Sequence, residues 1–227
     1  MHRTMHRPLP LGTVSARSAL LILISLTVVG SMITYAWGTP AALVLALLAL
    51  LWYNGIYTPL KKKTAFAVIP GSLVGSLPIM AGWAAAGGSL MDPKLIVLSV
   101  YFFVWQIPHF WLLMDIYASD YERAGFQTLK KHMSEKTFAI STYLWTVGLV
   151  IISAFFLTTG VVQGVVAGGI VTALGVWLIA GTLGIVRHYG NKKVYKHAFM
   201  RINIYVLAVT VVILVAALLN LISPWRF

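Results

Sequence analysis

Seven long apolar stretches separated by short polar segments dominate the pattern along the chain. They lie near residues 18–37, 40–57, 65–87, 95–114, 138–158, 161–186 and 202–222. Each is long enough to cross about 30 Å of hydrocarbon as an α-helix, and a helix satisfies its own backbone hydrogen bonds, as the lipid interior requires. The pattern predicts an all-α, polytopic integral membrane protein with one domain over residues 1–227 and no soluble appendage.

The basic residues fall almost entirely on one side of the membrane when the polar segments are assigned to alternating sides. The side that contains residues 1–17 holds 15 of the 17 Lys and Arg residues, and the other side holds Lys94 and Arg226. Basic loops stay in the cytoplasm. The split therefore predicts that these loops, and any site on them, face the cytoplasm from a bacterial inner membrane.

Composition agrees with this class. Of 227 residues, 59% are hydrophobic and 10% are charged, whereas soluble domains carry about 25% charged residues. A net charge of +12 would indicate a nucleic-acid partner in a soluble protein, but here membrane topology explains it and we expect no nucleic acid. The chain has no cysteine, which excludes disulfides and thiolate metal sites.

The segment YNGIYTPLKKKT, residues 53–64, places a tyrosine, a proline and three lysines at the predicted membrane interface. Interfacial Tyr and Lys residues often serve only as anchors. Alternatively, Lys61 and Lys62 form an anion site, because ammonium groups bind phosphate oxygens through charge-assisted hydrogen bonds.

The next apolar stretch is interrupted by prolines and glycines. Pro70 and Pro78 free backbone carbonyls, and irregular backbone within a membrane is tolerated only where protein buries it or where it lines a cavity. Gly71 and Gly75 form a G-x-x-x-G pair, which is typical of close helix packing. Both interpretations remain open at this point.

The stretch from 101 to 126 contains the polar residues that are the strongest candidates for a functional site. Gln106 and His109 lie inside a predicted membrane helix, where polar residues are costly and usually functional. If one helix continues through this stretch, Asp120 lies about 20° from His109 around the axis, Gln106 about 60° and Asp115 about 120°. One face would then join His109 to a carboxylate at the cytoplasmic mouth, and Asp115 would point elsewhere. The alternatives are a His109 bonded to a neighbouring helix and a solvated Asp120.

Carboxylates, basic residues and an aromatic-walled membrane cavity together suit one kind of chemistry. Carboxylates bind Mg²⁺, which usually reaches a protein with phosphate ligands, and aromatic faces stabilise cations. These parts predict a prenyltransferase acting on a membrane-soluble diphosphate. A phosphate-carrying transporter would use similar parts.

Five sequence blocks resemble the protoheme IX farnesyltransferases, the haem O synthases among UbiA-type intramembrane prenyltransferases. In chain order they are RTMHRPLP (3–10), YTPLKKKT (57–64), PGSLVGSLPIMAGW (70–83), WQIPHFW (105–111) and SDYERAG (119–125). The blocks keep the family's order, and the residues after 126 match only as apolar helices.

The resemblance implies a UbiA-type bundle of nine transmembrane helices around a central cavity, of which seven are present. It also implies farnesyl diphosphate and haem B as substrates, Mg²⁺ as cofactor, and haem O with diphosphate as products. The haem vinyl group would attack the farnesyl cation, and water would supply the product's hydroxyl group. A haem A synthase is the implied downstream partner.

Carried onto this chain, the resemblance implies two groups of site residues. Asp120 would help to bind Mg²⁺ through the diphosphate, with Asp120, Lys61 and Arg7 as the catalytic set. The diphosphate would be held by Arg3, Arg7, Tyr57, Lys61, Lys62 and Tyr121. The haem or the prenyl tail would be faced by Trp105, Gln106, His109 and Phe110.

The chain also departs from the family's pattern. Ala67 and Ile79 stand where the family often has Asn and Pro, and FQTLKKH replaces a proline-containing segment after Gly125. The family's first acidic motif, N-x-x-x-D-x-x-x-D, normally lies just before the first block, and no acid precedes Asp92. We therefore expect that the first two helices are missing and that the 227-residue chain alone is weak or inactive.

Two other functions stay open on the sequence alone. One is a UbiA-type transferase with another aromatic acceptor, such as a quinone precursor. The other is a non-catalytic membrane protein, either a transporter or an inactive fragment.

Overall fold

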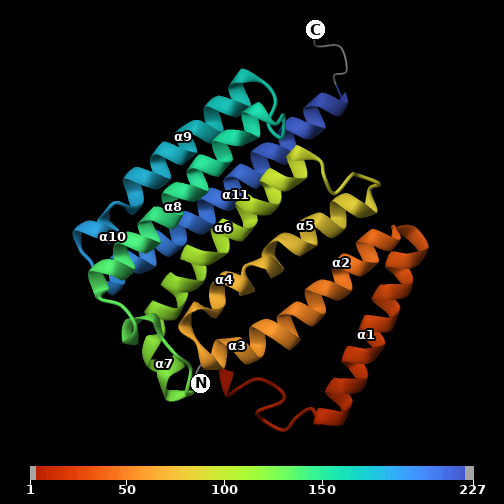
Figure 1. The fold of residues 1–227 in the computed structure, drawn as a ribbon, viewed down its shortest axis with the longest axis vertical. Helices are drawn as coiled ribbons and strands as arrows, with labels where there is room; N and C mark the ends of the chain where they lie inside the picture. Colours follow the sequence, from red (N-terminus) through yellow and green to blue (C-terminus); the bar gives the residue numbers. More distant parts are fainter. Residues whose placement is uncertain (1–3, 223–227) are drawn as a thin grey trace.

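Helices joined by short loops make up residues 4–222, which are the residues that the computed structural model describes (Figure 1). Seven helical spans within them are long and apolar enough to cross a membrane. Their bounds are Ala16–Trp37, Pro40–Lys63, Ala65–Ala85, Pro93–Ile116, Glu135–Thr158, Val165–Arg187 and Lys192–Leu219. The predicted number of spans and the all-α class are confirmed.

Four spans are single helices, and three are interrupted. The single helices are α1 (Ala16–Trp37), α6 (Pro93–Ile116), α8 (Glu135–Thr158) and α11 (Lys192–Ile222). The second span consists of α2 (Pro40–Leu51), a π-helical segment (Trp52–Tyr57) and α3 (Thr58–Lys63). The third consists of a 3₁₀ turn (Ala65–Ala67), α4 (Val68–Gly71) and α5 (Leu73–Ala85). The sixth consists of α9 (Val165–Thr182) and α10 (Gly184–Arg187), and the short α7 (Ala118–Arg123) follows α6.

Helix α6 lies at the centre of the bundle. It packs against α5 on one side and against α8 and α11 on the other, and α9 covers α8 and α11. Tyr101 on α6 is fully buried there, with its ring centre 5.0 Å from that of Phe156 on α8. A smaller core joins α2 to α5, while α1 stands at the edge against α2 and has no buried residue (Figure 1).

One end of the bundle collects the short polar helices. Figure 1 shows α3, α7 and α10 at the same end, and the loops around them carry the lysine-rich segments. We call this the basic end. The loops at 86–92 and 159–164 lie at the opposite end.

The last helix begins earlier than predicted, at Lys192 rather than near residue 202. The Asn191 side chain accepts hydrogen bonds from the backbone N–H groups of Lys193 and Val194, at 3.0 and 3.4 Å. Such a cap starts a helix without any need for apolar residues. The polar first turns therefore extend α11 beyond the apolar stretch, which is why hydropathy alone missed them.

The helix through Asp120 that the sequence suggested is not continuous. Helix α6 ends at Ile116, because Tyr117 leaves the helical region with φ −108° and ψ 25°, and α7 starts at Ala118. After this turn, Ala118, Thr128 and Leu129 are buried around Trp111 and Asp115. The alignment of Asp120 with His109 on one helical face is therefore wrong, because burying this loop turns the chain out of the axis of α6.

Candidate active site

A small cleft with a volume of about 30 Å³, open on one side to solvent, lies at the basic end. Three separate parts of the chain form it: the end of the second span with the turn after it, the last turns of α6, and α7 with the loop after it. The lining residues are Tyr57, Lys61, Thr64, Ala65, Ala67, Val68, Phe110, Met114, Tyr121, Phe126 and Gln127. The lining of the cleft therefore combines polar side chains, one of them a lysine, with apolar side chains.

Lys61 is the basic residue among the described residues that line this cleft. Its ammonium nitrogen lies 5.3 Å from the centre of the Tyr57 ring and 5.7 Å from that of Tyr53. These cation–π contacts hold the side chain over two aromatic rings, and within residues 4–222 it forms no ion pair. Its positive charge is therefore available to an anion in the cleft.

The two glycines of the G-x-x-x-G pair seat two of the predicted site residues. The ring of Tyr57 lies so close to Gly71 that a Cβ atom there would overlap it. In the same way, a Cβ atom at Gly75 would overlap the side chain of Gln106. The close-packing interpretation of the pair is confirmed.

The proline carbonyl in this region has a partner. The indole N–H of Trp52 donates to the Pro70 carbonyl at 2.8 Å. Trp52 opens the π-helical segment, so this bond ties the wide turn before Tyr57 to the α4 region. The bond thus helps to place the wall of the cleft.

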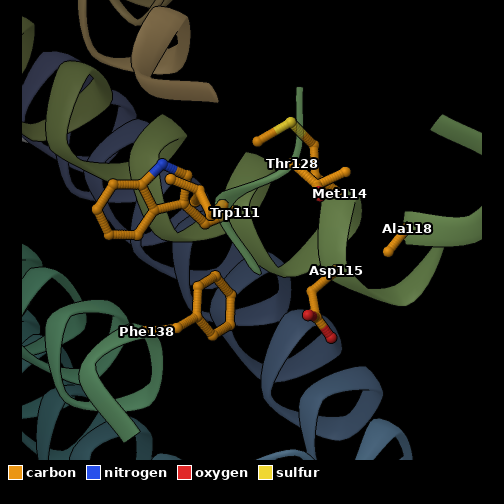
Figure 2. Close-up of a pocket in the computed structure, with 7 residues that line it drawn as sticks. Trp111, Met114, Asp115, Ala118, Thr128 and Phe138 are labelled. Carbon is orange, nitrogen blue, oxygen red and sulfur yellow. The ribbon is translucent and has the colours of Figure 1, made fainter. Parts of the chain in front are cut away.

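The acidic residues near the cleft have different contacts and surroundings. The hydroxyl of Thr128 donates to Glu122 Oε1 at 2.6 Å, which closes the loop after α7. Asp115 is only 4% exposed and lines a separate small cavity with Trp111 and Phe138 (Figure 2), so it points away from the cleft, as predicted. Asp120 is half-buried and directly precedes Tyr121, which lines the cleft.

Asp120 is therefore an acidic residue that adjoins a cleft residue in the sequence and that could hold a metal together with a diphosphate. No group of three or more His, Cys, Asp or Glu residues that could hold a metal ion occurs in the described part of the chain. Mg²⁺, however, is usually held by one or two carboxylates together with substrate phosphates. A single carboxylate that adjoins a cleft residue is compatible with that type of site.

An aromatic cluster continues inward from the cleft. The ring centre of His109 lies 5.1 Å from that of Phe110, which lines the cleft, and 5.2 Å from that of Trp105. From α11, Phe199 approaches the same imidazole to 4.9 Å. The cluster thus surrounds the imidazole of His109 with aromatic rings from α6 and α11.

His109 is also bonded to a neighbouring helix, one of the alternatives that the sequence left open. Its Nδ1 atom lies 2.8 Å from Oδ1 of Asn203 on α11. Asn203 was not among the predicted site residues, although a polar residue inside an apolar span is itself a signal of function. The cleft residues Phe126 and Gln127 were also missed, because they belong to a segment read only as a departure from the family's pattern.

The structure brings together some of the predicted residues and not others. Tyr57, Lys61, Phe110 and Tyr121 line one cleft, and the aromatic cluster with His109 and Trp105 adjoins it. Gln106 instead packs on Gly75. Two of the predicted basic residues, Arg7 and Lys62, are exposed and do not line the cleft. Arg3 lies outside the described residues.

The chain belongs to the UbiA prenyltransferase family, whose model matches residues 1–205. It is an integral membrane protein with the polytopic helical architecture of that family.

Several curated relatives named protoheme IX farnesyltransferase are similar to it. The one from Geobacter sulfurreducens is 42% identical over 126 residues, 55% of this chain and 46% of the relative. Those from Christiangramia forsetii and Nitratidesulfovibrio vulgaris are 34% and 31% identical over 79% and 82% of this chain. The chain spans 46% to 64% of the length of these three relatives. No solved structure matches the chain.

Proposed function

We propose that the protein is a prenyltransferase that moves the farnesyl group of farnesyl diphosphate to the vinyl group of haem B, giving haem O and diphosphate. The observation that carries this proposal is the cleft at the basic end, where Lys61 and Tyr57 meet Phe110 and Tyr121. The polar lining residues suit a diphosphate, and the apolar ones suit a prenyl chain. The names of the relatives supply the acceptor.

The polar residues of the cleft would bind the diphosphate group of the substrate. Lys61 would bind the phosphate oxygens, and the hydroxyl groups of Tyr57 and Tyr121 would donate hydrogen bonds to them. When the bond between C1 of the farnesyl group and oxygen breaks, its electron pair leaves with the diphosphate, and a fixed ammonium group stabilises that charge as it develops. Arg7 and Lys62 belong to this set only if the loops that carry them close over the bound substrate.

Asp120 would hold Mg²⁺ together with the diphosphate oxygens. When bound, the ion neutralises the charge that develops on the departing diphosphate. The rest of α7 would keep Tyr121 in the cleft, which places the carboxylate and the phenol on the same side of the leaving group.

The acceptor would occupy the aromatic cluster. The rings of Trp105, His109 and Phe110 would face the allylic cation and the porphyrin. The vinyl group then forms the new carbon–carbon bond, and water adds its hydroxyl group to the resulting cation with release of a proton. Gln106, seated on Gly75, would lie beside this acceptor site.

We further propose that the basic end faces the cytoplasm from a bacterial inner membrane. Basic loops remain on that side, and there a water-soluble diphosphate head could enter the cleft. A haem A synthase in the same membrane would take up the haem O formed.

Product analysis tests this function. Membranes that contain the protein are incubated with Mg²⁺, farnesyl diphosphate labelled in the prenyl chain, haem B and 4-hydroxybenzoate as a competing aromatic acceptor. We expect label in a haem product with the mass of haem O, formed at a low rate by the 227-residue chain, and much less with the Lys61→Gln variant. Label in the prenylated benzoate, or no labelled product with either acceptor, would overturn the proposal.

A further inference from the structure

The hydrogen bonds around Asn203 fix which nitrogen of His109 carries the proton. Asn203 Nδ2 donates to the Phe199 carbonyl at 2.7 Å, so its Oδ1 faces His109 Nδ1 at 2.8 Å. Turning the amide over would set two acceptors, Oδ1 and the Phe199 carbonyl, against each other. Because an amide oxygen can only accept, His109 Nδ1 must be the donor.

The other ring nitrogen, Nε2, is left with a lone pair. No residue between 4 and 222 forms a hydrogen bond with it, and no carboxylate of that part of the chain lies within ion-pair distance of the imidazole. A charged imidazolium without such a partner is disfavoured in an apolar interior. The arrangement thus favours a neutral imidazole whose Nε2 is an acceptor or a metal ligand.

We propose that Asn203 is a positioning residue that holds His109 in this tautomer, so that Nε2 binds the iron of the haem acceptor. The proposal rests on the proposed function, because it requires haem as the acceptor. The iron is the part of haem B that a lone pair complements, since the vinyl groups offer no hydrogen-bond donor and the propionates are themselves acceptors. The rings of Trp105, Phe110 and Phe199 around His109 would pack on the porphyrin.

The bond to Asn203 would do more than set the tautomer. A histidine that ligates a metal usually donates its other N–H to a second group, which fixes the ring and raises its basicity, and loss of that group typically lowers metal affinity 10–100-fold. Asn203 is itself held by the backbone of its own helix at Phe199. The imidazole is thereby fixed between α6 and α11 before any ligand binds.

Porphyrin titrations of the purified protein test the proposal. Haem B and metal-free protoporphyrin IX are titrated separately, and the Soret band reports the ligation of the iron. We expect Asn203→Ala to weaken haem B binding 10–100-fold with loss of the histidine-ligated spectrum, while its affinity for the metal-free porphyrin stays within twofold of wild type. Asn203→Asp should keep tight haem binding with a shifted Soret band, because a carboxylate makes the imidazole more electron-rich.

A control on the same helix separates ligation from packing. Thr210 on α11 bonds only to the Val206 carbonyl of its own helix, so Thr210→Val should leave both titrations unchanged. Wild-type haem affinity and spectrum in Asn203→Ala would overturn the positioning role, as would an equal loss of both porphyrins. If Asn203→Ala does not fold, an unshifted Soret band in Asn203→Asp would overturn it. Failure of the wild-type protein to bind either porphyrin would instead overturn the proposed acceptor.

Discussion

The side chain of Gln106 on α6 lies against the bare backbone of Gly75 on α5, with no room for a Cβ atom between them. This contact joins the α2–α5 pair to the larger bundle of α6, α8, α9 and α11, because α5 meets that bundle through α6. The wall that carries Tyr57 is therefore placed, through this contact, relative to the wall that carries His109 and Phe110.

Substitution of Gly75 by alanine should separate these two walls. The added methyl group must displace Gln106 or push α5 away from α6, and overpacking of this kind typically costs about 1–3 kcal/mol. We expect a lower thermal unfolding temperature in detergent and a weaker affinity for farnesyl diphosphate. Gly82→Ala is the matched control on the same helix, since its Cβ would meet nothing within 4 Å; equal effects of the two variants would show that the contact with Gln106 does not matter.

Lys61 and Lys63 provide a second matched pair, two positions apart in the same lysine run. Lys61 lines the cleft, whereas Lys63 is exposed and does not. A charged hydrogen bond is worth about 1.5–3 kcal/mol, so Lys61→Gln should raise the Kd for farnesyl diphosphate about tenfold or more. Lys63→Gln should change it less than twofold. Calorimetric titration with farnesyl diphosphate gives both Kd values. Similar losses of affinity in both variants would show that the lysine run only sets the orientation of the protein in the membrane.

The bond between Thr128 and Glu122 should hold the loop that carries Phe126 and Gln127 into the cleft. Its length of 2.6 Å and the charged acceptor predict a coupling energy of about 1.5–3 kcal/mol. Proteolysis of the loop between residues 118 and 132, measured for Glu122→Gln, Thr128→Val and the double variant, gives that coupling. Arg123→Gln, an exposed neighbour, should leave the rate unchanged, and additive effects of the two single variants would exclude a direct bond.

Much of the fold could be predicted from the sequence, because membrane spans depend on length and hydropathy. The G-x-x-x-G pair and the Tyr57–Lys61 segment were also found, since each is a local pattern. Asn203 was missed for the opposite reason: its partner His109 lies 94 residues away. The break at Tyr117 was missed because the angles between residues were calculated for one continuous helix axis. The chain turns there as Thr128 and Leu129 become buried, and these two residues lie beyond α6.

That break changes how the two aspartates of this region should be compared. Asp120 does not belong to the face of α6 that carries His109. It lies on α7 directly before Tyr121, which lines the cleft. Asp115 remains on α6 and is buried in the separate cavity of Figure 2. A role in catalysis and a role in stability are therefore expected to separate between two residues only five positions apart.

Asn substitutions at the two positions test this separation, because they remove the charge and keep the volume. Asp120→Asn should lower farnesyl transfer by about 10²-fold, the scale of losing one group that stabilises developing charge, and should raise the Mg²⁺ concentration needed for half-maximal rate. Asp115→Asn should leave the Mg²⁺ dependence as in wild type and change the thermal unfolding temperature instead. If both variants lost transfer equally with the same shift in Mg²⁺ dependence, Asp120 would not be the residue that specifically holds Mg²⁺ at the diphosphate. Another carboxylate would then have to bind the ion at the cleft.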